Sequence, residues 1–310
     1  MPSKRLQYPS MISDDYLKYP KRRYGMDHDR YEWSELHKRK KIAWPGGARV
    51  ALWVTVSLQW FPLDQQGKPF KALGSLQTAY PDLRHYTLRD YGNRVGIFRV
   101  MKALEKHGIR ASAAVNAAVA LRYPSLIETL RAQRWELMGH GLDMDHLHYE
   151  GMSGEKELIA RCISVIKPRG WLSPARSESS QTPDLLAEAG IEYVCDWVND
   201  DMPYVFKTKS RDLVAMPLSG DIDDAVILLG MHHDEDELLH QLTDQFDLLY
   251  DEAASEGGRV MSVTLHPWAI GQPYRIGILE QALAHFMRHP GVWPATGAEI
   301  LDAWKATRAA

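Results

Sequence analysis

Two histidines stand where packing alone would not select them. His140 lies between two glycines in GHGLDMDH, and His266 follows an apolar run in LHPW. An imidazole can transfer a proton near neutral pH or bind a metal ion through a ring nitrogen. We expect His266 to act as an acid, a base or a partner of the leaving group, and His140 to be a ligand or an oxyanion donor. The alternative for His266 is a structural histidine bonded to a backbone carbonyl, and the alternative for His140 is a tight turn formed by its flanking glycines.

Polar residues in other segments could hold a small polar substrate. The segment RDYGNR (89–94) offers three of them, unless Asp90 and Arg94 only form a surface ion pair. Glu178 faces either the pocket or solvent, and Trp197 is either a site residue or a core residue. The predicted substrate-binding residues are Gln59, Asp90, Asn93, Arg94, Glu178, Asp196, Trp197 and Trp268.

These segments need a scaffold that brings them together, and the chain alternates between strand-like and helix-like runs. Residues 48–58 (ARVALWVTVSL) are typical of a strand buried on both faces. Further strands are predicted at 110–117, 135–139, 170–174, 191–197, 213–218, 225–229 and 259–266, and helices at 94–106, 123–134, 153–165, 182–189, within 235–254, 275–289 and 296–307. Such repeats predict parallel strands with right-handed crossovers, and catalytic residues at the carboxyl ends of the strands.

The chain is predicted to have one domain and an arm. Residues 47–310 contain no repeat or linker, which indicates a single α/β barrel domain. Residues 1–46 are polar and rich in tyrosine, and they form either an arm that packs on the barrel or on a second subunit, or a partly disordered tail. Aromatic residues such as Tyr24, Tyr31 and Trp33 favour packing. The arm also suggests a homo-oligomer.

The composition excludes several classes of protein. The 310 residues are 45% hydrophobic and 25% charged with a net charge of −3, so neither nucleic acid nor an anionic membrane is an expected partner. The only cysteines, Cys162 and Cys195, do not suggest disulfides or a zinc finger. The amino terminus shows no signal peptide and no apolar run is long enough to span a bilayer. We therefore expect a cytoplasmic protein with a small-molecule substrate.

Five runs occur in an order that resembles the polysaccharide-deacetylase superfamily, most closely its allantoinase-like and cyclic-imide-hydrolase-like members. They are RDYGNRVG, PRGWLSP, TPDLLAEAG, DW followed by DDMPY, and LHPWAIGQPYR, and the resemblance covers nearly all of residues 26–305. It implies a distorted seven-stranded (β/α) barrel of the polysaccharide-deacetylase type. It also implies hydrolysis of a carbon–nitrogen bond other than a peptide bond.

The residues expected for catalysis in that superfamily are only partly present. The usual machinery has an aspartate base and a metal-binding aspartate after the first strand, two metal-binding histidines four residues apart, and a late histidine. The first metal histidine matches His140 and the late histidine matches His266. Ser57 and Gln59 stand at the acidic positions, and Met144 stands at the second histidine position.

This departure leaves three possibilities for the cofactor. The loop after His140 could rebuild a metal site, because zinc needs about three protein ligands. Its ligands would be His140, His266 and Asp145, or in place of Asp145 one of Asp143, His146 and His148. The enzyme could instead work without a metal, or the chain could be catalytically impaired. We therefore expect either no cofactor or one divalent metal ion, Zn²⁺ or Mn²⁺. Gln59 cannot serve as a base, but its amide can hold a substrate.

The combined reading is a hydrolase that opens a small cyclic amide, imide or ureide. In that reaction water attacks a ring carbonyl and the ring nitrogen leaves. The alternative activity is deacetylation of N-acetylated sugars or peptidoglycan. A further alternative is a ligand-binding barrel that has lost turnover, which Ser57 and Gln59 suggest.

Overall fold

The computed structural model describes residues 30–64 and 83–309, so that predictions for Tyr24 and for the rest of residues 1–29 lie outside it. The predicted first strand is β1 (Val50–Leu58), and all of its residues are buried. It pairs in parallel with β2 (Ser112–Val115) and with β8 (Arg259–Leu265). A strand flanked and covered in this way is mostly apolar, here with Thr55 and Ser57 as polar exceptions, which explains why its sequence does not alternate.

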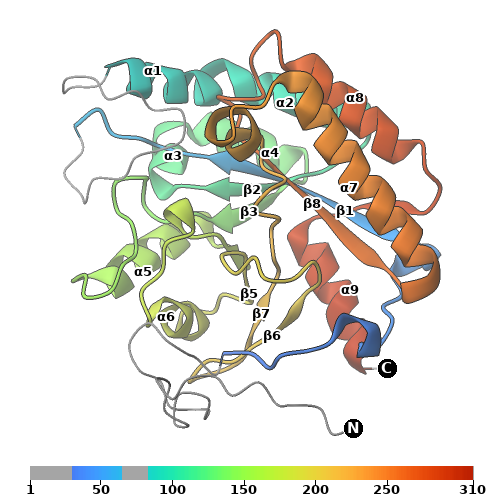
Figure 1. The fold of residues 1–310 in the computed structure, drawn as a ribbon. Helices are drawn as coiled ribbons and strands as arrows, with labels where there is room; N and C mark the ends of the chain where they lie inside the picture. Colours follow the sequence, from blue (N-terminus) through green and yellow to red (C-terminus); the bar gives the residue numbers. More distant parts are fainter. Residues whose placement is uncertain (1–29, 65–82, 310) are drawn as a thin grey trace, which may run out of the picture.

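The other strands extend the sheet away from β1, and Figure 1 shows that the sheet curls. Within the described residues, seven strands run parallel in the order β7-β5-β4-β3-β2-β1-β8. Two short strands are added, β6 antiparallel to β7 and β9 along the start of β1. The strands not yet given are β3 (Glu136–Gly139), β4 (Gly170–Trp171), β5 (Tyr193–Val194), β6 (Tyr204–Phe206), β7 (Leu213–Ala215) and β9 (Val292–Pro294).

The barrel is only partly closed between β7 and β8. No ladder joins these two strands in the described part of the chain. The segment after β7 approaches β8 instead, through a parallel bridge between Asp223 and Thr264 and a hydrogen bond of 3.2 Å from the Thr264 N–H to the Ile222 carbonyl. The prediction of a distorted seven-stranded barrel is thus confirmed, and the open seam brings the Asp223 segment beside the end of β8.

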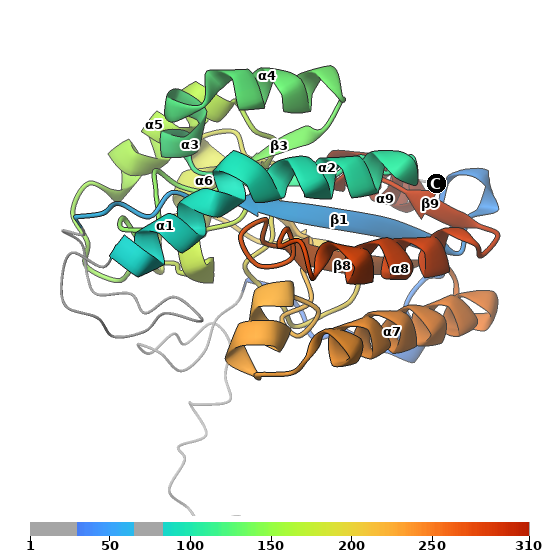
Figure 2. The same cartoon turned by 90° about the horizontal axis from the view of Figure 1, so that it is seen from above.

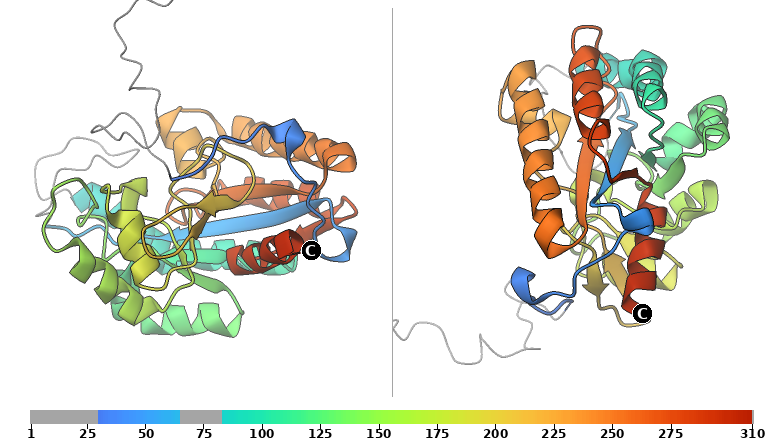
Figure 3. Two further views of the ribbon diagram at one scale, coloured as in Figure 1. Left: turned by 90° about the horizontal axis from the view of Figure 1, so that it is seen from below. Right: turned by 90° about the vertical axis from the view of Figure 1, so that its right-hand side faces the viewer.

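Helices cover the outside of the sheet, as Figures 2 and 3 show. α7 and α8 lie side by side next to β8, and α4 and α5 pack near β3. α9 begins beside the first residues of β2 and β3, where the Gly297 N–H donates to Ser112 Oγ at 2.9 Å. The helices are α1 (Leu83–Tyr91), α2 (Ile97–Lys106), α3 (Ala117–Arg122), α4 (Pro124–Ala132), α5 (Glu155–Ile166), α6 (Thr182–Glu188), α7 (Glu235–Glu256), α8 (Ile276–Met287) and α9 (Gly297–Ala309).

The barrel interior is apolar at one end and polar at the other. Alternate residues of β1 face the helices or the interior, because side chains alternate along a strand. Ala51 and Trp53 belong to an interior cluster that α9 closes through Ile300 and Trp304. Farther along the same face of β1 is Ser57, at the carboxyl end. This filling leaves only the carboxyl end of the barrel open for a site.

The strand predicted at 225–229 is wrong. Residues Val226–Gly230 form a π-helical turn instead, and Asp223 Oδ1 caps it by accepting the N–H groups of Ala225 (2.9 Å) and Val226 (3.2 Å). A short apolar run fits a buried helix as well as a strand, and periodicity cannot separate them. The capping aspartate, a common start of a helical turn, decides the outcome.

The described part of the arm touches the barrel at some points only. Arg30 makes a bidentate contact with Asp184 at 2.7 and 3.0 Å, and the Tyr31 ring packs edge-on against Trp197. Trp33 is 83% exposed, so the barrel does not cover it as expected. No helix among the described residues is long and apolar enough to cross a membrane.

Candidate active site

A pocket of about 300 Å³ lies at the carboxyl ends of the parallel strands. Its wall comes mainly from residues that follow β1, β3, β4, β7 and β8. The lining residues are Ser57, Gln59, Phe61, Arg89, His140, Met144, Leu172, Ser173, Ala175, Arg176, Asp223, Ala225, Thr264, His266 and Trp268. The two histidines expected to carry chemistry therefore face one cavity.

His140 is a buried, neutral imidazole with a fixed tautomer. Its Nδ1 lies 2.7 Å from the Leu172 carbonyl, which can only accept, so Nδ1 carries the proton. Its Nε2 then presents a lone pair to the amide nitrogen of Gln59 at 3.4 Å. Burial lowers the pKa of His140 to about 4. This arrangement suits an acceptor and does not suit the oxyanion donor that we had considered.

The glycines on either side of His140 are required by close packing. A Cβ atom at Gly139 would lie 2.4 Å from the Trp171 ring, and one at Gly141 would lie 2.4 Å from Pro174. Gly141 also has a φ of +66°, in the left-handed region that glycine tolerates best. The GHG sequence thus fixes the imidazole against the next strand.

His266 forms a dyad with Asp224. Its Nδ1 lies 2.8 Å from Asp224 Oδ1, and its main-chain N–H is 2.9 Å from both oxygens of that carboxylate. Asp223 Oδ1 is 3.4 Å from the same ring nitrogen. Burial disfavours the charged ring, but the two carboxylates outweigh burial and raise the pKa of His266. With Nδ1 engaged, Nε2 is the ring nitrogen left for the pocket.

A buried arginine adds positive charge to the pocket wall. The guanidinium carbon of Arg89 lies 3.3 Å from the centre of the Trp268 ring, a cation–π contact. Burial lowers the pKa of Arg89 to about 9, while the charge of Asp224 acts in the opposite direction. Arg89 therefore remains a cation at neutral pH.

Of the predicted substrate-binding residues, only Gln59 and Trp268 line the pocket. Asn93 lies behind Gln59 and donates from Nδ2 to its carbonyl at 2.9 Å. Asp90 instead accepts from the Tyr123 hydroxyl at 2.9 Å, and the side chain of Arg94 is 71% exposed. Asn93, Asp90 and Arg94 therefore do not line the pocket.

The three remaining predicted residues form a partly buried cluster outside the pocket lining, in which Glu178 Oε1 and Asp196 Oδ2 are buried. Trp197 Nε1 donates to Glu178 at 3.1 Å, and Asp196 accepts from the Ser173 N–H at 2.8 Å. Burial and then the charge of Asp196 raise the pKa of Glu178 well above its usual value. Two adjacent buried carboxyl groups of this kind share a proton. They position Ser173, which does line the pocket.

Sequence reasoning missed Asp223, Asp224 and Arg89. The two aspartates follow the strand ending near residue 218, but the incorrect strand at 225–229 placed them before a strand. Arg89 lies next to residues that were chosen, and the helical register was the missing signal. Residues 89 and 93 are four apart and share a helix face.

The donor set around His140 does not fit a catalytic metal. Around His140, Ser57 and Gln59 stand where the superfamily that the sequence resembles has acidic residues, and Nε2 faces the Gln59 amide. Asp145 is not grouped with His140 or His266 in any metal-like cluster of the described residues. Asp223, Asp224 and His266 do cluster. However, the Asp224 oxygens already accept hydrogen bonds from His266, and Asp223 Oδ1 caps the π-helical turn.

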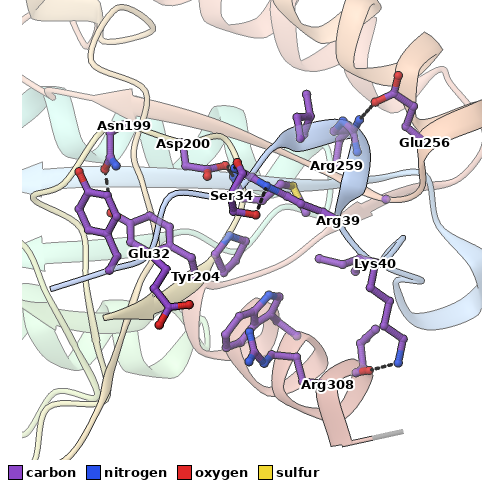
Figure 4. A pocket seen from close by; sticks show the side chains of 18 of the residues that line it. Glu32, Ser34, Arg39, Lys40, Asn199, Asp200, Tyr204, Glu256, Arg259 and Arg308 are labelled. Carbon is purple, nitrogen blue, oxygen red and sulfur yellow. Dashed lines mark hydrogen bonds and ion pairs between the residues drawn. The ribbon is translucent and has the colours of Figure 1, made fainter. Parts of the chain in front are cut away.

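A second pocket of about 370 Å³ lies between residues 31–42, the loop at 199–204 and α9 (Figure 4). Its charges are largely paired, with Arg39 at 2.7 Å from Asp200 and Arg259 at 2.7 Å from Glu256. No histidine or cysteine lines it within the described ranges. It also adjoins the start of β8 and not its carboxyl end, so it is not the candidate active site.

Two proteins of known name are similar to this chain in sequence. No model of a known protein family matches the chain. The chain is 24% identical over 241 residues to a Schizosaccharomyces pombe protein whose name describes a polysaccharide deacetylase, covering 70% of this chain and 75% of that one. It is 21% identical over 250 residues to the peptidoglycan deacetylase of Helicobacter pylori, covering 68% and 84%.

Two solved structures share the fold along most of the chain. The crystal structure of Puue allantoinase matches with a TM-score of 0.79 and 25% identity over 89% of this chain and 99% of that one. A Pseudomonas aeruginosa PAO1 structure described as a polysaccharide deacetylase matches with a TM-score of 0.78 and 24% identity over 86% and 95%. The half-open barrel is common to all three.

Proposed function

We propose that this chain, a member of the polysaccharide-deacetylase superfamily in its allantoinase-like branch, opens a small cyclic amide, imide or ureide by hydrolysing a ring carbon–nitrogen bond. The observation that carries the proposal is the His266–Asp224 dyad, which faces a pocket that also holds the Gln59 amide and the Arg89 cation. The similar proteins named as a peptidoglycan deacetylase and an allantoinase support an activity of this type.

The size and lining of the pocket favour a small ring over a polymer. A cavity of about 300 Å³ that combines apolar walls with converging polar side chains is typical of sites for small molecules. Phe61, Leu172 and Trp268 supply the apolar walls. A glycan chain would instead need an extended groove with exposed aromatic residues.

The dyad supplies the proton transfers. His266 Nε2 takes a proton from the attacking water and then gives it to the departing ring nitrogen. Asp224 holds the proton of Nδ1 and stabilises the charged ring while it exists, as the aspartate of a catalytic triad does. His266 must be neutral to begin the reaction, so its raised pKa requires a pH above the usual histidine range.

Gln59 and Arg89 bind the ring in this mechanism. Because Gln59 Nε2 donates to the lone pair of His140, the amide is oriented and its Oε1 is left to accept a ring N–H. Arg89 provides a positive charge for the oxyanion that forms when water adds to the carbonyl. Neither role needs an acid at the first strand end.

The test is a substrate panel with purified protein. Succinimide, hydantoin, dihydrouracil and allantoin should be opened, and activity should persist after treatment with a chelator. His266→Ala should lose it by about 10²-fold or more. Ring opening that disappears on chelation and returns with Zn²⁺ would refute the mechanism without a metal.

Deacetylation is the second candidate, because the two curated relatives are named as deacetylases. Release of acetate from N-acetylglucosamine oligomers, with no ring opening, would favour it. Binding of a cyclic imide without turnover would instead indicate a barrel that has lost activity.

A further inference from the structure

A second group of metal-ligand residues lies on the outside of the barrel, between α7 and α8. Figures 2 and 3 show these two helices side by side. Asp247 comes from α7, His285 from α8, and His289 from just beyond the end of α8. Asp247 Oδ1 is 2.6 Å from His285 Nε2, and one ligand atom from each residue lies within 4.8 Å of the other two.

We propose that Asp247, His285 and His289 bind one divalent transition-metal ion of the Zn²⁺ type. Two imidazoles and a carboxylate make the three-ligand set that zinc accepts, with solvent in the open positions. The ring centres of His285 and His289 are 5.0 Å apart, because the chain turns beyond α8 and the His289 N–H donates to the Phe286 carbonyl at 3.2 Å. Asp247 completes the set from the neighbouring helix.

The hydrogen bond at His289 prepares that ring for a metal. Its Nδ1 lies 2.8 Å from the His285 carbonyl, so Nδ1 carries the proton. The neutral ring then has its lone pair on Nε2. Metal-binding histidines commonly have one ring N–H held in this way by a backbone carbonyl, which fixes the tautomer.

An aromatic cluster holds both rings in place. The Phe246 ring centre is 5.7 Å from that of His285 and 5.1 Å from that of His289, and Tyr250 is also 5.1 Å from His289. The Tyr250 hydroxyl donates to the Pro290 carbonyl at 2.9 Å and so fixes the chain after His289. Rings that are already ordered lose little entropy when they bind an ion.

Arg288 opposes the metal and makes the proposal specific. Its Nη2 donates to His285 Nδ1 at 2.8 Å, which leaves the proton of this ring on Nε2, facing Asp247. To bind a metal through Nε2, His285 must move that proton to Nδ1, and Arg288 must leave. Because Arg288 is exposed, it can turn into solvent. Removing Arg288 should therefore strengthen metal binding.

The ion would join α7 and α8, the α-helices that come next in the sequence after the two dyad residues. Asp224 precedes α7, and His266 precedes α8. A bridge between the helices would stabilise the fold, because an ion that binds only the folded state raises the free energy of unfolding. It lies on the outer surface and takes no part in the proposed hydrolysis.

The experiment is calorimetric titration of chelator-treated, full-length protein with ZnSO₄, together with thermal unfolding at the same Zn²⁺ concentrations. We expect one site per chain and a thermal midpoint that rises with Zn²⁺. Asp247→Asn and His289→Ala should each weaken binding by about tenfold or more and remove the thermal shift, whereas Arg288→Ala should strengthen binding.

Two control variants should leave this site unchanged. They are His240→Ala, which changes an exposed α7 histidine outside the cluster, and His140→Ala, which changes the histidine in the pocket. Circular dichroism of each variant without metal checks that it folds. A wild type that binds no Zn²⁺, or binding that Asp247→Asn and His289→Ala leave intact, would overturn the proposal.

Discussion

Asp224 receives three contacts from the same residue, His266: the Nδ1 of the ring at 2.8 Å and the main-chain N–H at 2.9 Å from each carboxylate oxygen. The carboxylate therefore fixes both the position of the strand end and the orientation of the imidazole. This relationship joins the segment after β7 to the end of β8 across the open seam of the barrel. The predictions for catalysis depend on it.

Asp224→Asn keeps the size of the side chain and removes its charge. We expect kcat to fall by about 10² to 10⁴-fold, as in other His–Asp pairs that lose the carboxylate. The pKa of His266 should also fall, because Asp224 is one of the charges that raise it. The midpoint of the rise in activity with pH should therefore lie at a lower pH in Asp224→Asn than in the wild type.

Asp221→Asn is the matched control, since Asp221 is an exposed acid in the same loop. Its kcat and pH profile should equal those of the wild type. A pH profile that Asp224→Asn leaves in place, with full activity, would show that Asp224 has only a structural role.

Gln59 tests whether the first strand end binds substrate. Gln59→Ala should mainly raise KM, because it removes a contact made before and during the reaction. Gln59→Glu should abolish activity, since a carboxylate cannot donate to the lone pair of His140 Nε2. If instead the wild type is silent and Gln59→Glu creates activity, above all with added Zn²⁺, then the chain is an impaired metal enzyme.

The buried His140 should make stability depend on pH. Its pKa is about 4 in the folded chain and about 6.5 when unfolded, so the unfolded state binds the extra proton between these values. Its contribution is present above pH 6.5 and is lost as pH falls toward 4, by roughly 3 kcal/mol in total. Urea unfolding from pH 7 to pH 4.5 should show a smaller loss in His140→Gln, and an equal loss in both proteins would contradict the assignment.

The long, regular elements were predicted from the sequence, whereas the polar residues of the site were predicted less well. The run at 48–58 is marked by its continuous β-branched apolar residues and the run at 235–254 by its helical period, and both are long enough to separate strand from helix. The five residues 225–229 are not, and their misassignment hid Asp223 and Asp224. In the segment 89–94, Arg89 and Asn93 lie on the helix face that is turned toward the site. The composition of the segment does not indicate which face that is.

The arm should affect two measurements through two different residues. Deleting residues 1–34 leaves the buried Asp184 without the bidentate Arg30 contact, so the thermal midpoint should fall. Trp33 is exposed in a single chain, and we propose that a second subunit covers it in a homo-oligomer. Trp33→Ser should then shift the elution volume in gel filtration and leave the monomer fold unchanged. If the deletion changes neither measurement, the arm is a passive tail.

The charge of Arg89 predicts a fall in activity at high pH. Burial brings the pKa of this guanidinium down to about 9, so an appreciable fraction of it becomes neutral at a pH where a surface arginine stays charged. Because the oxyanion needs the charged form, kcat/KM should rise as His266 loses its proton and fall again above about pH 9.

Arg89→Met should lose activity at every pH, by about 10²-fold or more, the scale on which a removed oxyanion donor acts. Arg94→Ala is the control, because the Arg94 side chain is exposed five residues along the same segment and should leave the profile unchanged. The protein must remain folded at the highest pH, which circular dichroism can verify. An activity that stays constant to pH 10.5 in the folded wild type would show that Arg89 does not stabilise the transition state.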